Sequence, residues 1–346
     1  MRPESEGQLA QIIRDASGPL SIVGGGTRLR PGEGAAERLE TRGLTGVTLY
    51  EPEALTLSVR AGTPLSVVQE TLAAEKQMLA FEPMGDATST IGGVVAANAA
   101  GPRRVQAGAA RDALIGIRMV DGEGNVIRNG GRVMKNVTGY DLVKLMAGSR
   151  GRLGVLTELT FRTAPVPPVR ATLALPELDA AAAVAALTSA LTGAFDVSGA
   201  AWLAGRGALI RLEGLAGSVA ERAEALAARL APFGTVTRTE DDPWPLLRCP
   251  NTQDPGGDTW RILCRPSEAP TLLAGLPQPL MLDWGGGLIH LRLPAGTSPA
   301  LPRFSGHARR LTGSPGLIPP RDAVTERLDR DLRARFDPRG IFQGED

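Results

Sequence analysis

The sequence predicts an α+β protein with a ligand-binding domain followed by a smaller second domain. Three observations indicate this. The chain has 346 residues, which is enough for two domains of ordinary size. Between Pro83 and Phe161, glycines at turn-like positions separate short apolar runs, and glycine lets the backbone approach a bound group closely. The proline-rich segment Pro165–Pro168 is then predicted to be a stiff linker, beyond which the pattern changes.

The N-terminal part is predicted to be scaffold around one glycine-rich turn. Residues Ser5–Gln8 resemble a capping box that begins a helix with an apolar stripe. The apolar run Leu20–Val23 is predicted to be a buried strand that leads into the turn Gly24–Thr27. Two strands within residues 47–60 and a helix after Pro64 complete the scaffold. No GxGxxG motif is present, so a Rossmann dinucleotide site is not supported.

Two further loops in the glycine-dense stretch are predicted to wrap a large rigid ligand. The first, residues 86–93, offers hydroxyl and amide groups and runs into the small residues Val94–Gly101. These features suit a pyrophosphate near the start of a short helix. The second is Gly148–Gly154, followed by the apolar strand Val155–Leu159. The alternative is a glycine-rich β-protein whose tight turns bind nothing.

Polar residues also stand among apolar ones at Lys135, Asn136, Tyr140 and Asp141. One interpretation is that they orient a loop beside the ligand. The other is a Tyr–Asp pair that bonds to the backbone inside the core.

Five segments in fixed order carry a resemblance to a known family. They read PMGDATSTIGG, GAARD, DGEGNVIRNGG, KNVTGYDL and GSRGRLGVLTE. Together they resemble the FAD-binding domain of the vanillyl-alcohol oxidase type, and within it the FAD-binding subunits of bacterial glycolate oxidases. The resemblance is continuous over about half of the chain, with further matches at Ser21–Thr27 and Phe336–Phe342.

The resemblance implies a fold, a domain division and a set of cofactor contacts. It implies a two-subdomain FAD-binding domain over residues 1–167, a smaller α+β cap domain over 168–310, and a C-terminal helix and tail, 311–346, that return to the FAD domain. The FAD contacts that it implies are at Gly24, Gly25, Gly26, Thr27, Pro83, Gly85, Asp86, Thr90, Ile91, Gly92, Gly93, Ala97, Asn98, Gly101, Gly108, Arg111, Asp112, Gly151, Gly154 and Val155.

The FAD is predicted to be bound without a covalent link. Histidyl attachment needs a histidine in the flavin domain, and the first histidine of the chain is His290. Cysteinyl attachment would need Cys249 or Cys264, which lie in the predicted cap. Two cysteines also exclude a Cys-ligated iron–sulfur cluster on this chain alone, and a reduced pair is favoured over a disulfide.

In the predicted cap, helices over residues 178–191 and 218–230 alternate with strands, which indicates an antiparallel sheet with helices on one face. His290 and Arg292 are the weak catalytic candidates there. A lone histidine on a strand is more often structural, and Arg292 either pairs with a substrate carboxylate or lies on a solvated strand face. A metal site needs three or more converging ligands, and no such spacing is visible, so no metal is predicted.

The last segments concern packing and partners. Val324, Leu328, Leu332 and Phe336 are predicted to form one packed helical face. The tryptophans of the predicted cap, such as Trp244, Trp260 and Trp284, fit an interface with partner proteins and ordinary core packing about equally well. The isolated chain is accordingly expected to be aggregation-prone or weakly folded in its cap.

Composition limits the remaining function classes. A net charge of +1 gives no reason to expect nucleic acid, and no apolar run is long enough for a membrane span. The N-terminus lacks a basic-then-apolar signal, so the chain is expected to be cytoplasmic, with peripheral attachment to the inner membrane through a complex as a further option.

Three functions stay open. The first is an FAD-binding glycolate oxidase subunit that takes hydride from a small 2-hydroxy acid. The second, favoured by the scarcity of histidine, is a flavoprotein that contributes a second flavin and passes electrons. The resemblance implies its partners, a larger flavin-containing glycolate oxidase subunit and an iron–sulfur subunit. The third is a stand-alone FAD-dependent oxidase or dehydrogenase of a 2-hydroxy acid or another alcohol.

Overall fold

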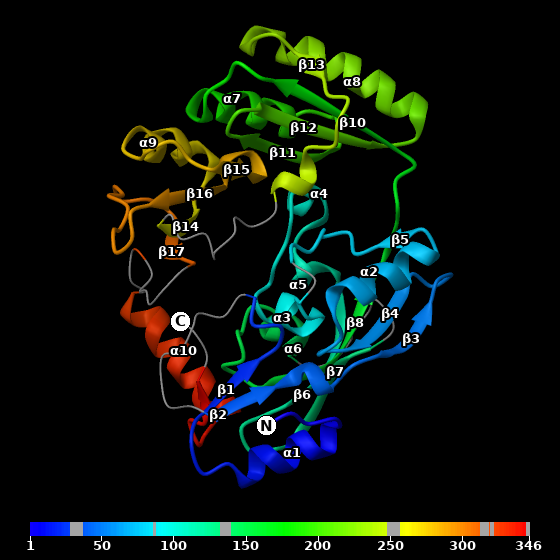
Figure 1. Ribbon diagram of the computed structural model, residues 1–346, viewed down its shortest axis with the longest axis vertical. Helices are drawn as coiled ribbons and strands as arrows, with labels where there is room; N and C mark the ends of the chain where they lie inside the picture. Colours follow the sequence, from blue (N-terminus) through cyan, green and yellow to red (C-terminus); the bar gives the residue numbers. More distant parts are fainter. Residues whose placement is uncertain are drawn as a thin grey trace. The chain divides into compact units, whose positions relative to one another are not determined.

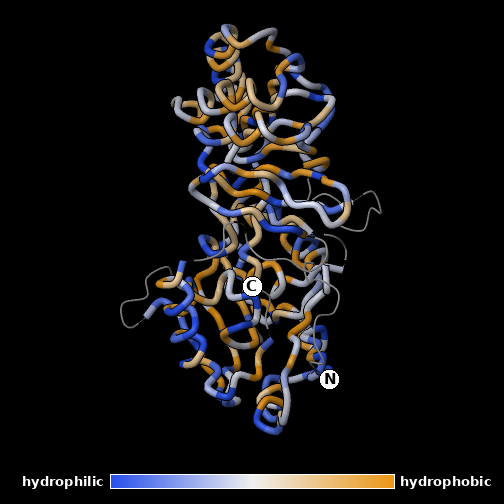
Figure 2. Tube along the Cα trace, turned by 90° about the vertical axis from the view of Figure 1, so that its left-hand side faces the viewer, coloured by the Kyte–Doolittle hydropathy of each residue, from blue (hydrophilic) through white to orange (hydrophobic). Residues whose placement is uncertain are grey.

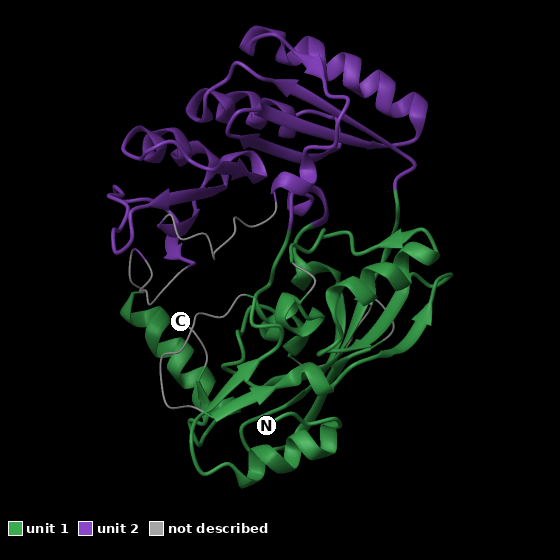
Figure 3. Ribbon diagram, viewed as in Figure 1, with its two compact units in different colours: residues 1–100, 108–166, 321–346 green, residues 101–107, 167–320 purple. Residues whose placement is uncertain are grey.

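The protein consists of two compact units of mixed helices and strands (Figure 1, Figure 3). The computed structural model describes residues 1–27, 37–85, 88–131, 140–247, 257–311, 318 and 322–343. Unit 1 comprises residues 1–100, 108–166 and 321–346, and unit 2 comprises residues 101–107 and 167–320. The border at 166/167 lies in the predicted proline linker.

Unit 1 contains the glycine-rich loops. Its helices are α1 (Glu6–Asp15), α2 (Leu65–Ala74), α3 (Ile91–Ala96), α5 (Ala110–Ala113), α6 (Leu142–Met146) and α10 (Ala323–Phe336). Its strands are β1 (Leu20–Val23), β2 (Glu37–Glu40), β3 (Val47–Glu51), β4 (Thr56–Arg60), β5 (Gln77–Met78), β6 (Leu114–Val120), β7 (Val126–Gly130), β8 (Val155–Arg162), β9 (Ala164–Pro165) and β18 (Phe342–Gln343).

A three-stranded parallel sheet, ordered β18-β1-β2, forms the first layer of unit 1. Helix α1 begins at the predicted cap, where Ser5 Oγ accepts from the backbone N–H of Gln8 at 3.2 Å. Its apolar face, with Leu9 and Ile13 fully buried, packs with Leu20 and Leu39 of the sheet. This packing holds β1 in place, and β1 leads directly into the turn Gly24–Thr27.

The second layer is a five-stranded antiparallel sheet, ordered β3-β4-β8-β6-β7. Alternate residues such as Leu57, Leu159 and Phe161 pack in one core with residues of α2, α3 and α6, because successive side chains of a strand point to opposite faces. On the other face Ser58 and Thr160 share a hydrogen bond of 2.8 Å. Figure 2 shows hydrophobic residues throughout the interior of each unit and hydrophilic residues at many of its outer turns. A two-stranded pair, β5-β9, completes unit 1.

Unit 2 is built on one eight-stranded antiparallel sheet, ordered β13-β10-β12-β11-β15-β16-β14-β17. Its strands are β10 (Val169–Leu175), β11 (Val197–Leu203), β12 (Gly207–Gly214), β13 (Thr237–Arg238), β14 (Asp258–Leu263), β15 (Met281–Asp283), β16 (Leu288–Leu293) and β17 (His307–Arg310). Its helices are α4 (Arg104–Ala107), α7 (Ala180–Leu191), α8 (Ala216–Leu230) and α9 (Ala269–Ala274).

Helices α7, α8 and α9 bury their apolar faces in the main core of unit 2, as the sequence predicts for a sheet with helices on one face. Trp260 lies in this core and Trp244 in a smaller cluster, and both are at most 3% exposed. These two tryptophans are therefore packing residues of unit 2, and the interface interpretation is wrong for them.

Residues 101–107 belong to unit 2, whereas the sequence analysis assigned them to the first domain. The Arg103 guanidinium forms a 2.7 Å ion pair with the buried carboxylate of Glu213 on β12. The indole N–H of Trp284 donates to the carbonyl of Gly101 at 3.0 Å, and the Gln106 amide donates to Asp196 at 2.7 Å. Side chains distant in the sequence thus attach this short segment to unit 2.

The C-terminus returns to unit 1. Backbone N–H groups of Ile341 and Phe342 donate to the Asp337 carboxylate, and Phe342 pairs in parallel with Leu20 of β1. In α10, Leu332 and Phe336 pack against the core of the five-stranded sheet, but Val324 and Leu328 are each 59% exposed. The prediction of a fully packed helical face is therefore wrong for the first half of α10. Within the described residues, every helix is too short or too polar to cross a membrane.

Candidate functional site

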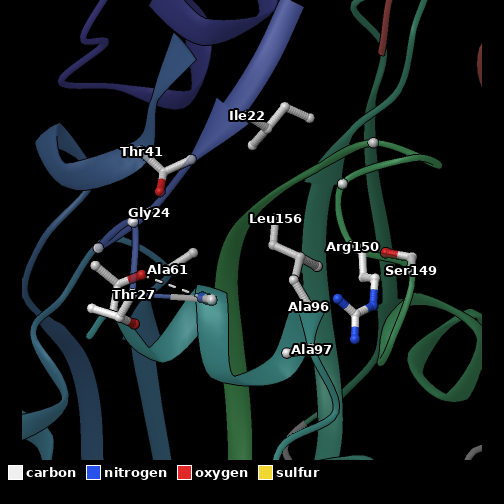
Figure 4. Close-up of a pocket in the computed structure, with 17 residues that line it drawn as sticks. Ile22, Gly24, Thr27, Thr41, Ala61, Ala96, Ala97, Ser149, Arg150 and Leu156 are labelled. Carbon is white, nitrogen blue, oxygen red and sulfur yellow. Dashed lines mark hydrogen bonds between the residues drawn. The ribbon is translucent and has the colours of Figure 1, made fainter. Parts of the chain in front are cut away.

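A cavity in unit 1 collects the glycine-rich loops (Figure 4). It contains about 760 Å³ of empty space, part of it open to solvent. The residues that line it come from the end of β1, from α3 and from the loop before β8. They are Ile22, Gly24, Gly25, Gly26, Thr27, Thr41, Ala61, Thr90, Gly92, Gly93, Ala96, Ala97, Ser149, Arg150, Gly151, Gly154 and Leu156.

The turn Gly24–Thr27 forms one side of the cavity and requires glycine. A Cβ atom at Gly25 would lie 2.1 Å from the carbonyl oxygen of Thr88, so no side chain fits between these two segments. The Arg42 guanidinium stabilises this turn by donating to the backbone carbonyls of Gly24 and Gly25, at 3.2 and 2.9 Å. The Thr27 hydroxyl is 3.0 Å from the Ser89 hydroxyl.

Helix α3 brings its small residues to the cavity. The Thr90 hydroxyl caps this helix by accepting from the N–H of Gly93 at 3.3 Å. Gly92 packs against the end of β4, where its N–H donates to the Ala61 carbonyl at 2.7 Å. A Cβ at Gly92 would lie 2.7 Å from that oxygen, whereas a Cβ at Gly93 would meet only the Thr90 hydroxyl, at 3.3 Å. Gly92 is therefore required for packing, and Gly93 leaves space at the cavity.

The loop before β8 forms the opposite side and contains four residues with positive φ, namely Gly148 (95°), Arg150 (54°), Gly151 (78°) and Gly154 (148°). The N–H of Arg150 donates to the carbonyl of Ala96 at 3.0 Å, which ties the loop to the end of α3. A Cβ at Gly151 would lie 3.2 Å from the Ile22 side chain. Glycine is thus needed where the loop approaches β1.

The cavity fits the predicted FAD. A side chain at Gly26 or Gly93 would project into largely empty space, because almost no atom lies within 4 Å of the Cβ position at either residue. The described lining is made of glycines, alanines, hydroxyl side chains, two aliphatic residues and one arginine. Such a lining offers backbone N–H groups and hydroxyls to phosphates and a flat neutral surface to aromatic rings.

The predicted cofactor residues divide into three groups. Those that line the cavity are Gly24, Gly25, Gly26, Thr27, Thr90, Gly92, Gly93, Ala97, Gly151 and Gly154. Those in the described chain but absent from its lining are Pro83, Gly85, Ile91, Asn98, Gly101, Gly108, Arg111, Asp112 and Val155. Asp86 lies outside the described residues, as do Lys135 and Asn136.

Most residues of the second group support the site indirectly. Ile91 and Val155 are fully buried in two cores, and the Asn98 side chain accepts from the N–H of Arg111 at 3.0 Å. The Asp112 carboxylate accepts from the N–H of Ala109 at 2.8 Å. Gly101 belongs to unit 2. These contacts give Ile91, Val155, Asn98 and Asp112 structural roles, and their contacts with FAD stay predictions.

Seven lining residues are not among the predicted FAD contacts, namely Ile22, Thr41, Ala61, Ala96, Ser149, Arg150 and Leu156. Ser149 and Arg150 lie in the predicted ligand loop Gly148–Gly154, and Leu156 lies in the strand predicted directly after it, so their position was a usable signal. Thr41 and Ala61 had no local signal. Separately, Tyr140 is 90% exposed, which excludes the buried Tyr–Asp pair, and Asp141 instead caps α6 through the N–H of Lys144.

The two catalytic candidates lie on β16 of unit 2. His290 is 1% exposed, pairs in register with Arg261 of β14, and has no hydrogen-bond partner among the described residues on either ring nitrogen. Burial and the charge of Arg261 lower the pKa of His290 to about 3, so the ring is neutral near pH 7. Arg292 is half-buried opposite Thr259. In the described part of the chain, no group of three His, Cys, Asp or Glu residues could hold a metal ion.

Replacing His290 by Leu is expected to raise the free energy of unfolding at pH 7 by about 1–3 kcal/mol, because it removes two buried unpaired polar atoms. Since the folded-state pKa of His290 is depressed, the unfolded chain binds the proton more tightly. Wild-type stability should therefore fall between about pH 6.5 and 3, by at most about 1.4 kcal/mol per pH unit from this group.

Urea unfolding followed at several pH values checks this prediction. The His290→Leu variant should lack this part of the acid dependence, and the His307→Leu control should retain it. A His290→Leu variant less stable than wild type at pH 7 would contradict the interpretation of His290 as an unsatisfied core residue.

Comparison with known proteins supports the cofactor assignment. Residues 1–130 match the family model described as FAD binding domain. The chain is 35% identical over 345 residues to glycolate oxidase subunit GlcE of Escherichia coli strain K12, covering 97% of this chain and 94% of that protein. It is 32% identical to a D-lactate dehydrogenase of Archaeoglobus fulgidus over 180 residues, and 34% identical to glycolate oxidase subunit GlcD of Bacillus subtilis over 191 residues. These two matches cover about half of this chain and 41% and 40% of the relatives.

Solved structures show the same fold. An alkyldihydroxyacetonephosphate synthase superposes with a TM-score of 0.70 over 99% of this chain and 76% of its own, at 14% identity. A p-cresol methylhydroxylase superposes with a TM-score of 0.66 over 85% and 74%, also at 14% identity. The α+β fold of the vanillyl-alcohol oxidase type, FAD as cofactor and the oxidoreductase class are therefore confirmed.

Proposed function

We propose that this chain, which belongs to the family of glycolate oxidase subunit GlcE, is the FAD-binding subunit of an enzyme complex. In this proposal the complex oxidises a small 2-hydroxy acid such as glycolate to the 2-oxo acid. The observation that carries the proposal is the cavity of unit 1, in which three separate glycine-bearing segments meet, in a chain that matches GlcE over 97% of its length. In this proposal the chain contributes a second flavin to the complex.

The residues that would hold FAD are those of the cavity. The turn Gly24–Thr27 offers amides and a hydroxyl to the diphosphate, the segment Thr90–Gly93 offers the Thr90 hydroxyl and the space beside Gly93, and the loop Ser149–Gly154 closes the other side. When bound, FAD supplies the acceptor for a hydride or for electrons. The chain's own contribution is to bind and orient the cofactor without a covalent link, because both histidines and Cys264 lie in unit 2 and the Cys249 position lies in the same part of the chain.

The proposed partners are a larger flavin-containing subunit and an iron–sulfur subunit, with the substrate oxidised mainly at the partner's flavin. Two observations support this assignment. The relative that matches nearly the whole chain, GlcE, is named as a subunit of glycolate oxidase. A separate glycolate oxidase subunit, GlcD, matches only about half of the chain. In addition, the catalytic candidate His290 is neutral and has both ring nitrogens buried.

The alternative is a stand-alone FAD-dependent dehydrogenase of a 2-hydroxy acid. The match to a D-lactate dehydrogenase over half of the chain favours it. In that case a base in this chain would take the hydroxyl proton and a cationic group would hold the carboxylate. His290 and Arg292 remain its candidate residues.

Anaerobic addition of glycolate distinguishes the two functions. We expect the purified chain to contain FAD that acid precipitation releases, and to keep its oxidised flavin spectrum when glycolate is added. The same chain co-expressed with both partner subunits should be better folded, and its complex should bleach. Bleaching of the isolated chain, followed by turnover with a soluble dye, would support the stand-alone enzyme instead. Flavin that stayed with the precipitated protein would contradict non-covalent binding.

A further inference from the structure

One charged side chain reaches the cavity from an unfavourable backbone conformation. Arg150 has φ of 54°, a region that non-glycine residues rarely occupy, and it stands between Gly148 (φ 95°) and Gly151 (φ 78°). Its N–H is held by the carbonyl of Ala96, and the N–H of Gly148 is held by that of Val95. A glycine would adopt this conformation at lower cost. Residues in such conformations persist where the surrounding structure enforces them, and they are frequent at ligand sites.

The charge of Arg150 distinguishes it from the rest of the site. Among the described lining residues, every other side chain is neutral. Oxidised FAD carries its formal negative charge on the diphosphate. A dianion that leaves water for a neutral cavity loses hydration that neutral hydroxyls and amides replace only in part. A counter-charge in the cavity would strengthen binding, and a guanidinium suits phosphate oxygens because its planar N–H groups match them in pairs.

The arrangement in Figure 4 allows such a contact. The Arg150 side chain extends from beside Ser149 towards Ala97, while Gly24 and Thr27 lie on the other side of the cavity. Between them, Ala96 and Ala97 of the α3 segment present only methyl groups. In this view the labelled side chains of Leu156 and Ala96 lie between Arg150 and Gly24, and all four residues line the same cavity.

Arg152, two residues from Arg150, has a structural role in this loop. Arg152 does not line the cavity, and its guanidinium lies 3.5 Å from the Asp329 carboxylate of α10. Its Nε donates to the carbonyl of Ser149 at 3.3 Å. Arg152 thus fastens the loop to unit 1, and it provides a matched control two residues from Arg150.

We infer that Arg150 binds the diphosphate of FAD and supplies the positive charge that this cavity needs. The inference rests on the proposal that FAD occupies the cavity. It adds a residue that the glycine motifs do not indicate, and it explains why an arginine stands at a position whose backbone favours glycine.

The test titrates FAD-free protein with FAD, followed by quenching of flavin fluorescence, at low and high salt. Arg150→Met is expected to weaken FAD binding at least about tenfold, and to make the affinity less dependent on salt. Arg150→Lys should recover most of the loss, since it restores the charge. Arg150→Gly should bind FAD as weakly as Arg150→Met. Arg152→Met should bind FAD as wild type does.

Competition with ADP and with riboflavin shows which part of FAD Arg150 contacts. The Arg150→Met variant should lose affinity for ADP in parallel with FAD and keep its affinity for riboflavin. Unchanged FAD binding by Arg150→Met would overturn the inference. An equal loss of FAD affinity in Arg150→Lys would overturn it as well, by showing that Arg150 acts on the loop and not through its charge. A loss of affinity for riboflavin with none for ADP would also overturn it, by showing a contact with the flavin ring. If wild-type protein itself failed to bind FAD, the proposed function would be at fault, not the role of Arg150.

Discussion

Replacing Glu213 by Gln is expected to lower the free energy of unfolding of unit 2 by about 3–5 kcal/mol. The Glu213 side chain is 3% exposed and forms ion pairs with Arg103 at 2.7 Å, Arg170 at 3.0 Å and Arg211 at 3.4 Å. Arg211 is fully buried and lies 4.5 Å from the centre of the Trp244 ring. Without the carboxylate, two buried guanidinium groups lose a charge partner, and such a loss is among the most destabilising single changes.

Tryptophan fluorescence during urea unfolding measures this effect selectively, because all four tryptophans of the chain lie in unit 2. The control is Asp241→Asn, which breaks the exposed pair of Arg206 with Asp241, and it should cost no more than about 1 kcal/mol. A Glu213→Gln variant as stable as the Asp241→Asn variant would show that the buried pair contributes little.

The pH dependence gives a second test of the same pair. Burial raises the pKa of Glu213, but Arg211 and Arg103 lower it more, so the folded-state pKa is below the ordinary value. The stabilisation by the carboxylate is therefore complete above the unfolded-state pKa of about 4.5 and is lost as the pH falls through the folded-state value. The difference between wild type and Glu213→Gln should shrink in that acidic range and stay constant above about pH 6.

Replacing Gly93 by Asp is expected to weaken FAD binding at least about a hundredfold, equivalent to roughly 3 kcal/mol, in a protein that still folds. The Cβ position at Gly93 has only the Thr90 hydroxyl within 4 Å, so the side chain enters the cavity without displacing backbone. Its carboxylate would then face the diphosphate of FAD, and like charges in a poorly hydrated site repel strongly. The variant should be soluble and colourless.

Two matched variants show whether a loss of FAD comes from the charge of the new side chain, from its size or from a folding defect. Gly93→Asn has nearly the same shape without the charge, so it should retain more FAD than Gly93→Asp. Gly92→Asp should lose FAD and also unfold more easily, because a Cβ there would lie 2.7 Å from the Ala61 carbonyl. Flavin content after purification and the melting temperature measure both effects. Full flavin content in Gly93→Asp would show that the diphosphate lies elsewhere.

The local elements were predictable because their signals lie within a few residues of one another. Strand β1 has the predicted bounds Leu20–Val23, and the glycine turn follows it directly. The alanine-rich helix α7 begins at Ala180, two residues after the predicted start, because Asp179 caps it through the N–H of Ala182. The motifs also indicated FAD, because glycines at fixed spacing reflect how closely a backbone must approach its neighbours.

The cavity itself required the tertiary structure. Thr41 and Ala61 line it because β2 and β4 end beside the glycine turn and α3, and neither residue has a local feature that marks a ligand site. Arg150 resembles any loop arginine in the sequence. Only the fold shows that it has a positive φ and reaches the cavity, whereas Arg152 points to Asp329.

By itself, the sequence therefore determined several secondary elements such as β1 and α7, the glycine-dependent turns, the α+β class and, by resemblance, the cofactor. The tertiary structure alone decided that residues 101–107 join unit 2 through the Arg103–Glu213 pair, and that Phe342 completes a sheet with Leu20. It also decided that His290 is buried without a hydrogen-bond partner. The physical reason is that backbone preferences depend on near neighbours, whereas burial, ion pairing and strand pairing depend on residues that only the folded chain brings together.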